Sequence, residues 1–124
     1  LGPIQILTVP GEMLPEFVLG GYDGSHTGPL ENILWDENPN PPDLSTAPAG
    51  PYPIDLMDGR YKMTFGLAND FLGYIIPEFQ YQLGEPAYLN EAPGDHYEET
   101  NSLGPSEAAI VLDVMERMIA WEAP

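Results

Sequence analysis

The chain has 124 residues, and its 20 Asp and Glu residues outnumber its 3 Lys and Arg residues, which gives a formal net charge of −17. Three basic side chains cannot form the patch that neutralises phosphates, so we expect neither a nucleic-acid partner nor binding to anionic lipid headgroups. The absence of cysteine excludes disulfides and thiolate metal sites. No apolar run approaches the roughly 20 residues of a membrane-spanning helix, so we expect no transmembrane segment.

The N-terminal residues predict a strand followed by a short helix. Apolar and polar side chains alternate over residues 2–8, and a Val-Pro-Gly turn ends this strand. Glu12 follows at the carboxyl end of the strand, which is where α/β proteins place their chemistry. Residues 13–19 predict a short helix, with Pro15 near its first turn, where proline is tolerated.

The next segment, residues 20–58, is rich in proline and glycine and is predicted to have almost no regular structure. The prolines of 38–42 and 47–53 predict that neither stretch holds a helix or a central strand. A segment of this kind is usually an active-site loop, a wrap or a linker. Trp35 and Tyr52 indicate that it is held against a surface.

Regular patterns return in the second half of the chain. Alternation over residues 60–65 predicts a second strand, and residues 71–76 form another short apolar run that Pro77 ends. Residues 83–96 again have the composition of a loop.

The last segment has the clearest helical pattern. Pro105 and Glu107 are typical of a helix start, because proline fits the first turn and an acid complements the helix dipole. Apolar side chains then recur at helical spacing: Val111, Val114, Met115 and Met118, with Ile110, Ile119 and Trp121 alongside. We expect an amphipathic helix that packs on a sheet, with its two methionines in the core, and hence an α/β fold.

The predicted helices and strands are few for a domain that folds by itself. A single long helix and a few short strands bury little apolar surface, and a net charge of −17 adds repulsion. We therefore expect the chain to complete another polypeptide instead of folding alone.

Common catalytic signatures do not occur in the sequence. There is no HExxH motif and no Walker A loop. Residues 24–28 only superficially resemble a nucleophile elbow, because the serine directly follows the first glycine. His26 and His96 are far apart in sequence, and both fall in predicted loops.

Three segments in order nevertheless resemble a known family. The first segment, residues 9–12, reads Val-Pro-Gly-Glu at the end of a strand. The second, residues 66–75, follows the second predicted strand, and Tyr81 comes shortly after it. The third is Tyr97-Glu98, which precedes the terminal helix. This order is similar to the last part of the catalytic domain of the neutral/alkaline, non-lysosomal ceramidases. Members of that family carry a PGE or PAE turn, an Asn-x-Tyr-x-x-Tyr stretch and a Tyr-Glu segment before a closing helix.

The resemblance implies a zinc site with defined ligands. Two upstream histidines, the Glu of the PGE turn and the second Tyr of the Asn-x-Tyr-x-x-Tyr stretch hold the metal in that family, which places two zinc ligands on Glu12 and Tyr74. The tyrosine of the Tyr-Glu segment, here Tyr97, would help to polarise the amide carbonyl. Zinc accepts carboxylate and imidazole ligands and activates a water, and a phenol can donate to a developing oxyanion. Neither His26 nor His96 occupies a ligand position of the family.

The same residue types also have simpler interpretations. Glu12 could be an exposed acid at a helix start, Tyr74 a half-buried core aromatic and Tyr97 a surface tyrosine. The chain also departs from the family pattern. Phe71 replaces the first tyrosine of the Asn-x-Tyr-x-x-Tyr stretch, and the two loop-rich segments widen the spacing between the motifs.

The resemblance implies that residues 1–124 are the C-terminal portion of one ceramidase-like catalytic domain, with 20–58 as an insertion. We expect a zinc-dependent amidohydrolase that cleaves the N-acyl amide of ceramide or a related lipid, at a secreted, periplasmic or membrane-surface location. The chain would be a cleaved subunit or proteolytic fragment, with the upstream portion of the same precursor as its partner. The two together are called the assembled protein below. The alternative is a non-enzymatic acidic interaction module that wraps a partner protein.

Overall fold

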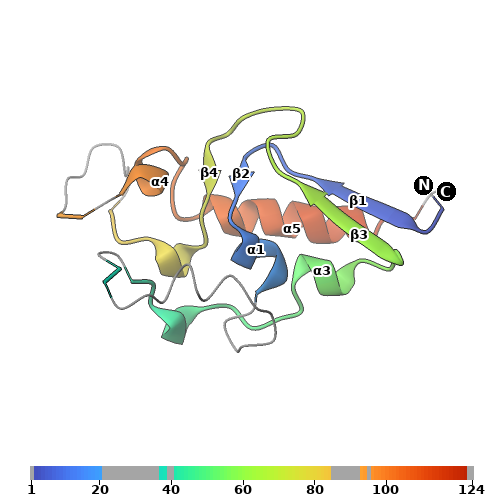
Figure 1. Ribbon diagram of the computed structural model, residues 1–124, viewed down its shortest axis with the longest axis horizontal. Coiled ribbons are helices and arrows are strands. Elements are labelled where there is room, and N and C mark those ends of the chain that lie inside the picture. Colours follow the sequence, from blue (N-terminus) through green and yellow to red (C-terminus); the bar gives the residue numbers. More distant parts are fainter. Residues whose placement is uncertain (1, 21–36, 39–40, 85–92, 95, 123–124) are drawn as a thin grey trace.

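The computed structural model describes residues 2–20, 37–38, 41–84, 93–94 and 96–122. The chain is a small α/β unit with short parallel strands (Figure 1). Its elements are, in chain order, β1 (Ile4–Thr8), β2 (Glu12–Met13), α1 (Pro15–Leu19), the 3₁₀ turn η1 (Leu44–Thr46), α3 (Pro53–Leu56), β3 (Tyr61–Phe65), β4 (Tyr74–Ile75), the 3₁₀ turn η2 (Glu78–Gln80), α4 (Tyr97–Thr100) and α5 (Glu107–Ile119).

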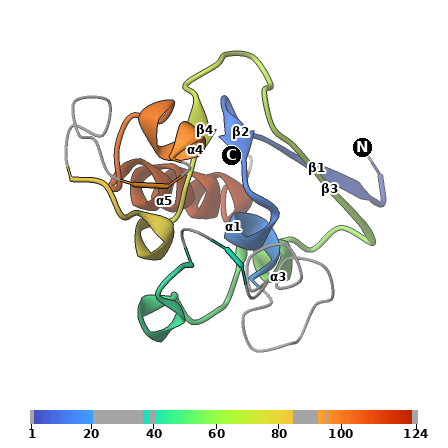
Figure 2. The same ribbon diagram turned by 60° about the vertical axis from the view of Figure 1, so that its left-hand side comes forward.

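Two separate parallel pairs of strands organise the molecule. β1 pairs with β3, and β2 pairs with β4. The two strands predicted within residues 2–8 and 60–65 are confirmed, as is the short helix α1 with Pro15 in its first turn. In both views the β1–β3 pair lies at one end of the molecule and α4 at the other (Figures 1 and 2).

The segment 20–58 contains more helix than its prolines suggested, so that expectation was wrong at one point. Pro53 begins the single turn α3, where a proline is tolerated because the first N–H groups of a helix have no partner within it. The Asp55 carboxylate accepts a hydrogen bond from the backbone N–H of Tyr52 at 3.0 Å and completes the cap. Positions 21–36, which include Trp35, and 39–40 lie outside the described residues, as do 85–92 and 95.

The core forms where α5 packs against β1, α1 and α3. α5 runs along the back of the molecule in Figure 1, behind α1 and the strands. The buried side chains of this core are Leu7, Val9, Phe17, Val18, Met57, Ile75, Ala108 and Met115. The predicted packing of the terminal helix on the strands is therefore confirmed.

The face that α5 buries differs in part from the predicted one. Met115 is 3% exposed, but Val114 and Met118 are 41% and 61% exposed. The helix instead directs Ala108, Met115 and the partly buried Val111 inward. Apolar side chains occupy more than one stripe of α5, so helical periodicity alone could not decide which stripe contacts the strands.

The opposite face of the β1–β3 pair is apolar and remains exposed. Register places Ile4 beside Tyr61, Ile6 beside Met63 and Thr8 beside Phe65. Ile6, Tyr61, Met63 and Phe65, here called the outer sheet face, are 42–50% exposed. Parallel sheets in soluble proteins are normally covered on both faces, so this surface is unusual for the fold class.

Within the described part of the chain, no helix has both the length and the apolar composition needed to cross a membrane.

The two methionines of α5 provide a matched test of the core. We expect Met115→Ala to lower the free energy of unfolding of the assembled protein by about 2–5 kcal/mol, because it leaves a cavity in the core. Met118→Ala should change it by less than about 0.5 kcal/mol, because its side chain is mostly in solvent. Urea unfolding of both variants measures the difference. Equal effects would show that α5 packs through another face.

Candidate active site

The pairing of β2 with β4 brings two predicted site residues together. Glu12 lies directly beside Tyr74 in parallel register, and Met13 lies beside Ile75. The backbone N–H of Glu12 donates to the Gly73 carbonyl oxygen at 2.8 Å and fixes this register. Side chains in register project from the same face of the pair, so the carboxylate and the phenol are neighbours.

Two glycines allow these strands to meet. A Cβ at Gly11 would lie 2.8 Å from the Gly73 carbonyl oxygen, which is too close for any side chain. Gly73 has φ +93°, and a Cβ there would collide with the Asn101 carbonyl oxygen. That oxygen accepts a hydrogen bond from the backbone N–H of Tyr74 at 3.0 Å. Glycine at position 73 therefore lets β4 contact both β2 and the segment after α4.

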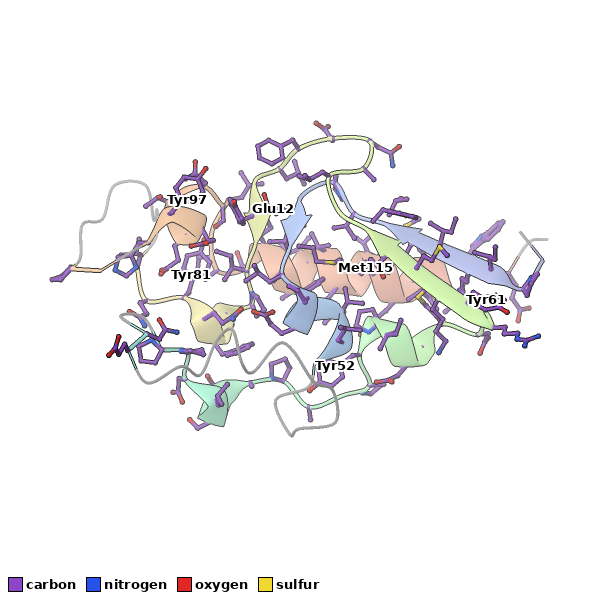
Figure 3. All side chains as sticks on the ribbon, viewed as in Figure 1. Glu12, Tyr52, Tyr61, Tyr81, Tyr97 and Met115 are labelled. Carbon is purple, nitrogen blue, oxygen red and sulfur yellow. The ribbon has the colours of Figure 1, made fainter. Side chains whose placement is uncertain are left out.

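Tyr97, the third predicted site residue, lies against Tyr74. It is the first residue of α4, and the two rings meet edge to face with centroids 5.7 Å apart and an interplanar angle of 75°. Tyr97 remains 59% exposed, Tyr74 is half-buried and Glu12 is exposed. In Figure 3 Tyr97 lies on α4 toward the left and Glu12 lies on β2 nearer the middle, with β4 between the two elements. We call these three residues the Glu12–Tyr74–Tyr97 cluster.

A buried carboxylate holds α4, and with it Tyr97, in place. Glu99 is only 5% exposed, and both of its oxygens are hydrogen-bonded. One oxygen contacts His96 Nδ1 at 2.7 Å, and the other accepts the backbone N–H groups of Gln82 and Leu83 at 2.9 and 2.7 Å. Hydrogen bonds to a carboxylate are stronger than those between neutral groups, so this arrangement clamps α4 to the chain after η2.

The hydrogen bonds around this clamp were not predicted from the sequence. The hydroxyl of Tyr81 hydrogen-bonds the hydroxyl of Ser102 and lies 3.3 Å from the Glu99 carbonyl oxygen. The three-residue spacing of His96 and Glu99, which places both side chains on one face of a helical turn, is the signal that could have predicted their pairing. His96 thus has a structural partner. His26 lies outside the described residues.

The negative charge around Tyr74 favours its protonated form. Burial raises the pKa of the Tyr74 hydroxyl, and the hydrogen bond with Glu12 raises it further. The charges of Glu12, Tyr97 and Glu98 act in the same direction. In the absence of a bound cation the phenol therefore keeps its proton at neutral pH, since its ordinary pKa is already about 10.

The cluster supplies oxygen donors for a metal but not a complete site. No group of three or more His, Cys, Asp or Glu side chains is placed to hold a metal ion within the described ranges. Glu12 and Tyr74 offer one carboxylate and one phenol, which are oxygen ligands of the kind that zinc accepts, whereas a catalytic zinc site usually has three protein ligands. These residues therefore fit part of a zinc site, and the remaining ligands would come from outside the described residues.

Comparisons with known proteins provide no relative from which the roles of these three residues could be assigned, so the roles stay predictions. No family model, no curated protein and no solved structure matches the chain. What the structure adds is spatial: three residues that are far apart in sequence lie together on β2, β4 and α4.

The influence of Glu12 on Tyr74 can be measured directly. In metal-free protein, we expect Glu12→Gln to lower the pKa of Tyr74, because the substitution removes the negative charge that opposes phenolate formation. NMR titration of the assembled protein with ¹³C-labelled tyrosine ring carbons would follow the shift, and Tyr74→Phe would assign the signal. Glu116→Gln, on an exposed part of α5, should leave the pKa unchanged. A Tyr74 pKa that does not move on Glu12→Gln substitution would contradict the described contact.

Proposed function

We propose that the chain is the C-terminal part of a zinc-dependent amidohydrolase that cleaves the N-acyl amide of ceramide or a related lipid. The observation that carries this proposal is the Glu12–Tyr74–Tyr97 cluster, in which parallel register and an edge-to-face contact assemble three side chains from separate elements. The resemblance to the ceramidase family assigns the same three positions to one site. Their proximity supports the proposal, because residues that share one metal and one substrate must lie close together.

The three side chains have different roles in this proposal. Glu12 and Tyr74 would hold zinc together with imidazoles from the upstream portion, and Tyr97 would donate a hydrogen bond to the substrate carbonyl oxygen. When bound, zinc would lower the pKa of a water and so supply the nucleophile. The Tyr74 proton must leave before its oxygen can act as an anionic ligand, so the metal affinity of the site should rise with pH.

Substitution of each residue separates these roles. In the assembled protein we expect Glu12→Ala and Tyr74→Phe to weaken zinc retention, with the larger loss for Glu12→Ala because it removes a full negative charge. Tyr97→Phe should retain zinc and lower turnover of an N-acyl-sphingosine substrate by roughly 10²–10³-fold, as is typical for the loss of one oxyanion donor. Zinc content by elemental analysis and a hydrolysis assay give the two measurements.

Several outcomes would overturn the proposal. If Tyr97→Phe lost zinc while Tyr74→Phe kept it, the assignment of the two tyrosines would be wrong. Assembled protein with no zinc and no amidase activity would favour the non-enzymatic interaction module. Tight, stoichiometric zinc binding by the 124-residue chain alone would show a self-contained site with different ligands.

The outer sheet face supports the second part of the proposal, which is the partner. Four half-exposed apolar side chains on a parallel sheet form the kind of surface that a further layer of structure normally covers. We propose that the upstream portion of the same precursor covers it. The strong negative charge of the chain is consistent with a partner that is less acidic.

Charged substitutions on this face test the partner. We expect Met63→Glu combined with Phe65→Glu to weaken association with the upstream portion by at least about 100-fold, because two carboxylates would be buried without partners. Leu103→Glu, at a position that is 71% exposed outside the sheet, is the control and should leave association unchanged. Co-purification and light scattering of the mixed chains provide the measurement. Undiminished association of the double variant would show that the upstream portion contacts a different surface.

A further inference from the structure

The β1–β3 pair is a parallel sheet of only two strands. Two strands alone form a marginally stable sheet in water, and a third strand is usually needed for stability. In Figure 1 β1 lies at the right-hand side of the molecule, with β3 beside it on one side only. Among the described residues, each of the two strands therefore has one edge with no neighbouring strand.

Two hydrogen bonds at the ends of the pair show which backbone groups of β1 face β3. The backbone N–H of Tyr61 donates to the Pro3 carbonyl oxygen at 3.0 Å, and the N–H of Val9 donates to the Phe65 carbonyl oxygen at 2.9 Å. Along a strand of a parallel ladder, residues that bond to one neighbour alternate with residues that face the opposite edge. The odd-numbered positions of β1 therefore face β3, and the even-numbered positions face away from it.

The backbone N–H and C=O groups of Ile4, Ile6 and Thr8 form what we call the free edge of β1. No other segment among the described residues hydrogen-bonds these groups. Thr8 and Ile6 are exposed, and Ile4 is partly buried. A row of unpaired backbone groups at strand spacing is a template for another strand.

The composition of the two strands indicates which of them is the true edge of the sheet. β1 reads Ile-Gln-Ile-Leu-Thr and has no charged residue, whereas β3 contains Lys62 and follows Arg60. Lysine is common on edge strands, because its charge opposes pairing with a further strand. A nearly continuous apolar sequence is typical of strands inside a parallel sheet. β1 therefore has the composition of an interior strand, and β3 has that of an edge strand.

We propose that a strand of the upstream portion pairs with the free edge of β1, so that β1 becomes an interior strand of the sheet. The added strand supplies backbone donors and acceptors to Ile4, Ile6 and Thr8, as in other cases of strand addition. A second copy of this chain is a poorer occupant, because it would bring another charge of −17 to the contact. The pairing rests on the partner in the proposed function, but not on zinc or on amide hydrolysis.

Hydrogen exchange of single amides in the assembled protein tests this pairing. NMR follows each backbone N–H when the 124-residue chain is ¹⁵N-labelled and the upstream portion is not. We expect the amides of Ile4, Ile6 and Thr8 to exchange at least about 100-fold more slowly than unstructured amides, because paired N–H groups exchange only through opening. The Leu7 amide, which faces β3, should be protected in any case, and the Lys62 amide, on the outer edge of β3, should exchange rapidly. Rapid exchange at the free edge of β1 beside a protected Leu7 would overturn the proposal.

Proline substitutions distinguish the two edges of the pair. Thr8→Pro removes an N–H that faces away from β3, so the β1–β3 ladder keeps its hydrogen bonds. We expect this variant to weaken association of the two portions by at least about tenfold, whereas Thr8→Ala, which keeps the N–H, should not. Lys62→Pro makes the same backbone change on the outer edge of β3 and should leave association unchanged. Light scattering and titration of the mixed chains give the measurement. Loss of association with Lys62→Pro alone would place the added strand on β3 and contradict the proposal.

The outcomes also separate the strand pairing from the proposed function. Assembled protein without zinc and without amidase activity would overturn the function and leave the expected exchange pattern unchanged. Portions that associate while the free edge of β1 exchanges rapidly would overturn only the pairing. If this edge is protected instead in a complex of two copies of the 124-residue chain, the occupant is a second copy and the proposal is wrong.

Discussion

The close contact between β2 and β4 at Gly11 and Gly73 is the constraint on which the candidate site depends. Two strands of two residues each have few ladder hydrogen bonds, so their register is set by the backbone around them. The bond from Glu12 N–H to the Gly73 carbonyl oxygen and the bond from Tyr74 N–H to the Asn101 carbonyl oxygen place β4 between β2 and the end of α4. A side chain at either glycine would separate these segments and, with them, Glu12, Tyr74 and Tyr97.

Acidic residues serve several different purposes in this chain. Glu99 is buried and uses both oxygens to hold α4 to the segment after η2. Glu12 raises the pKa of Tyr74 and, in the proposed function, offsets the charge of a cation. Glu16 is buried and accepts a hydrogen bond from Gln80 Nε2 at 2.6 Å. The charge of −17 is thus partly built into specific contacts and is not only a property of the solvated surface.

The distribution of apolar side chains explains why we propose a partner. The core includes residues from β1, β4, α1 and α5, yet the outer sheet face and one stripe of α5 remain in contact with solvent. The β1–β3 pair is covered on one face only, whereas a second layer usually buries the apolar side chains on the other face of a parallel sheet. A further layer on the outer sheet face would bury these side chains and complete the fold class.

The sequence by itself determined the longer local elements, and it proposed the residues of the candidate site. Alternation over residues 60–65 and helical spacing after Pro105 correctly predicted β3 and α5, because burial of one face imposes those periods. The α/β class followed from them. The order of three short motifs nominated Glu12, Tyr74 and Tyr97 as candidate site residues, because that order resembles a family in which the matching positions carry chemistry.

Only the tertiary structure decided what depends on contacts between distant segments. The pairs β2–β4 and Tyr74–Tyr97 join positions far apart in the chain, and two-residue strands leave no periodic pattern. The choice between the stripes of α5, which buries Met115 and exposes Met118, depended on which stripe fits against β1 and α1. The turn α3 formed in spite of its proline because Asp55 caps it at Tyr52. Each of these outcomes is set by packing and hydrogen bonds between particular groups, which residue patterns along the chain do not record.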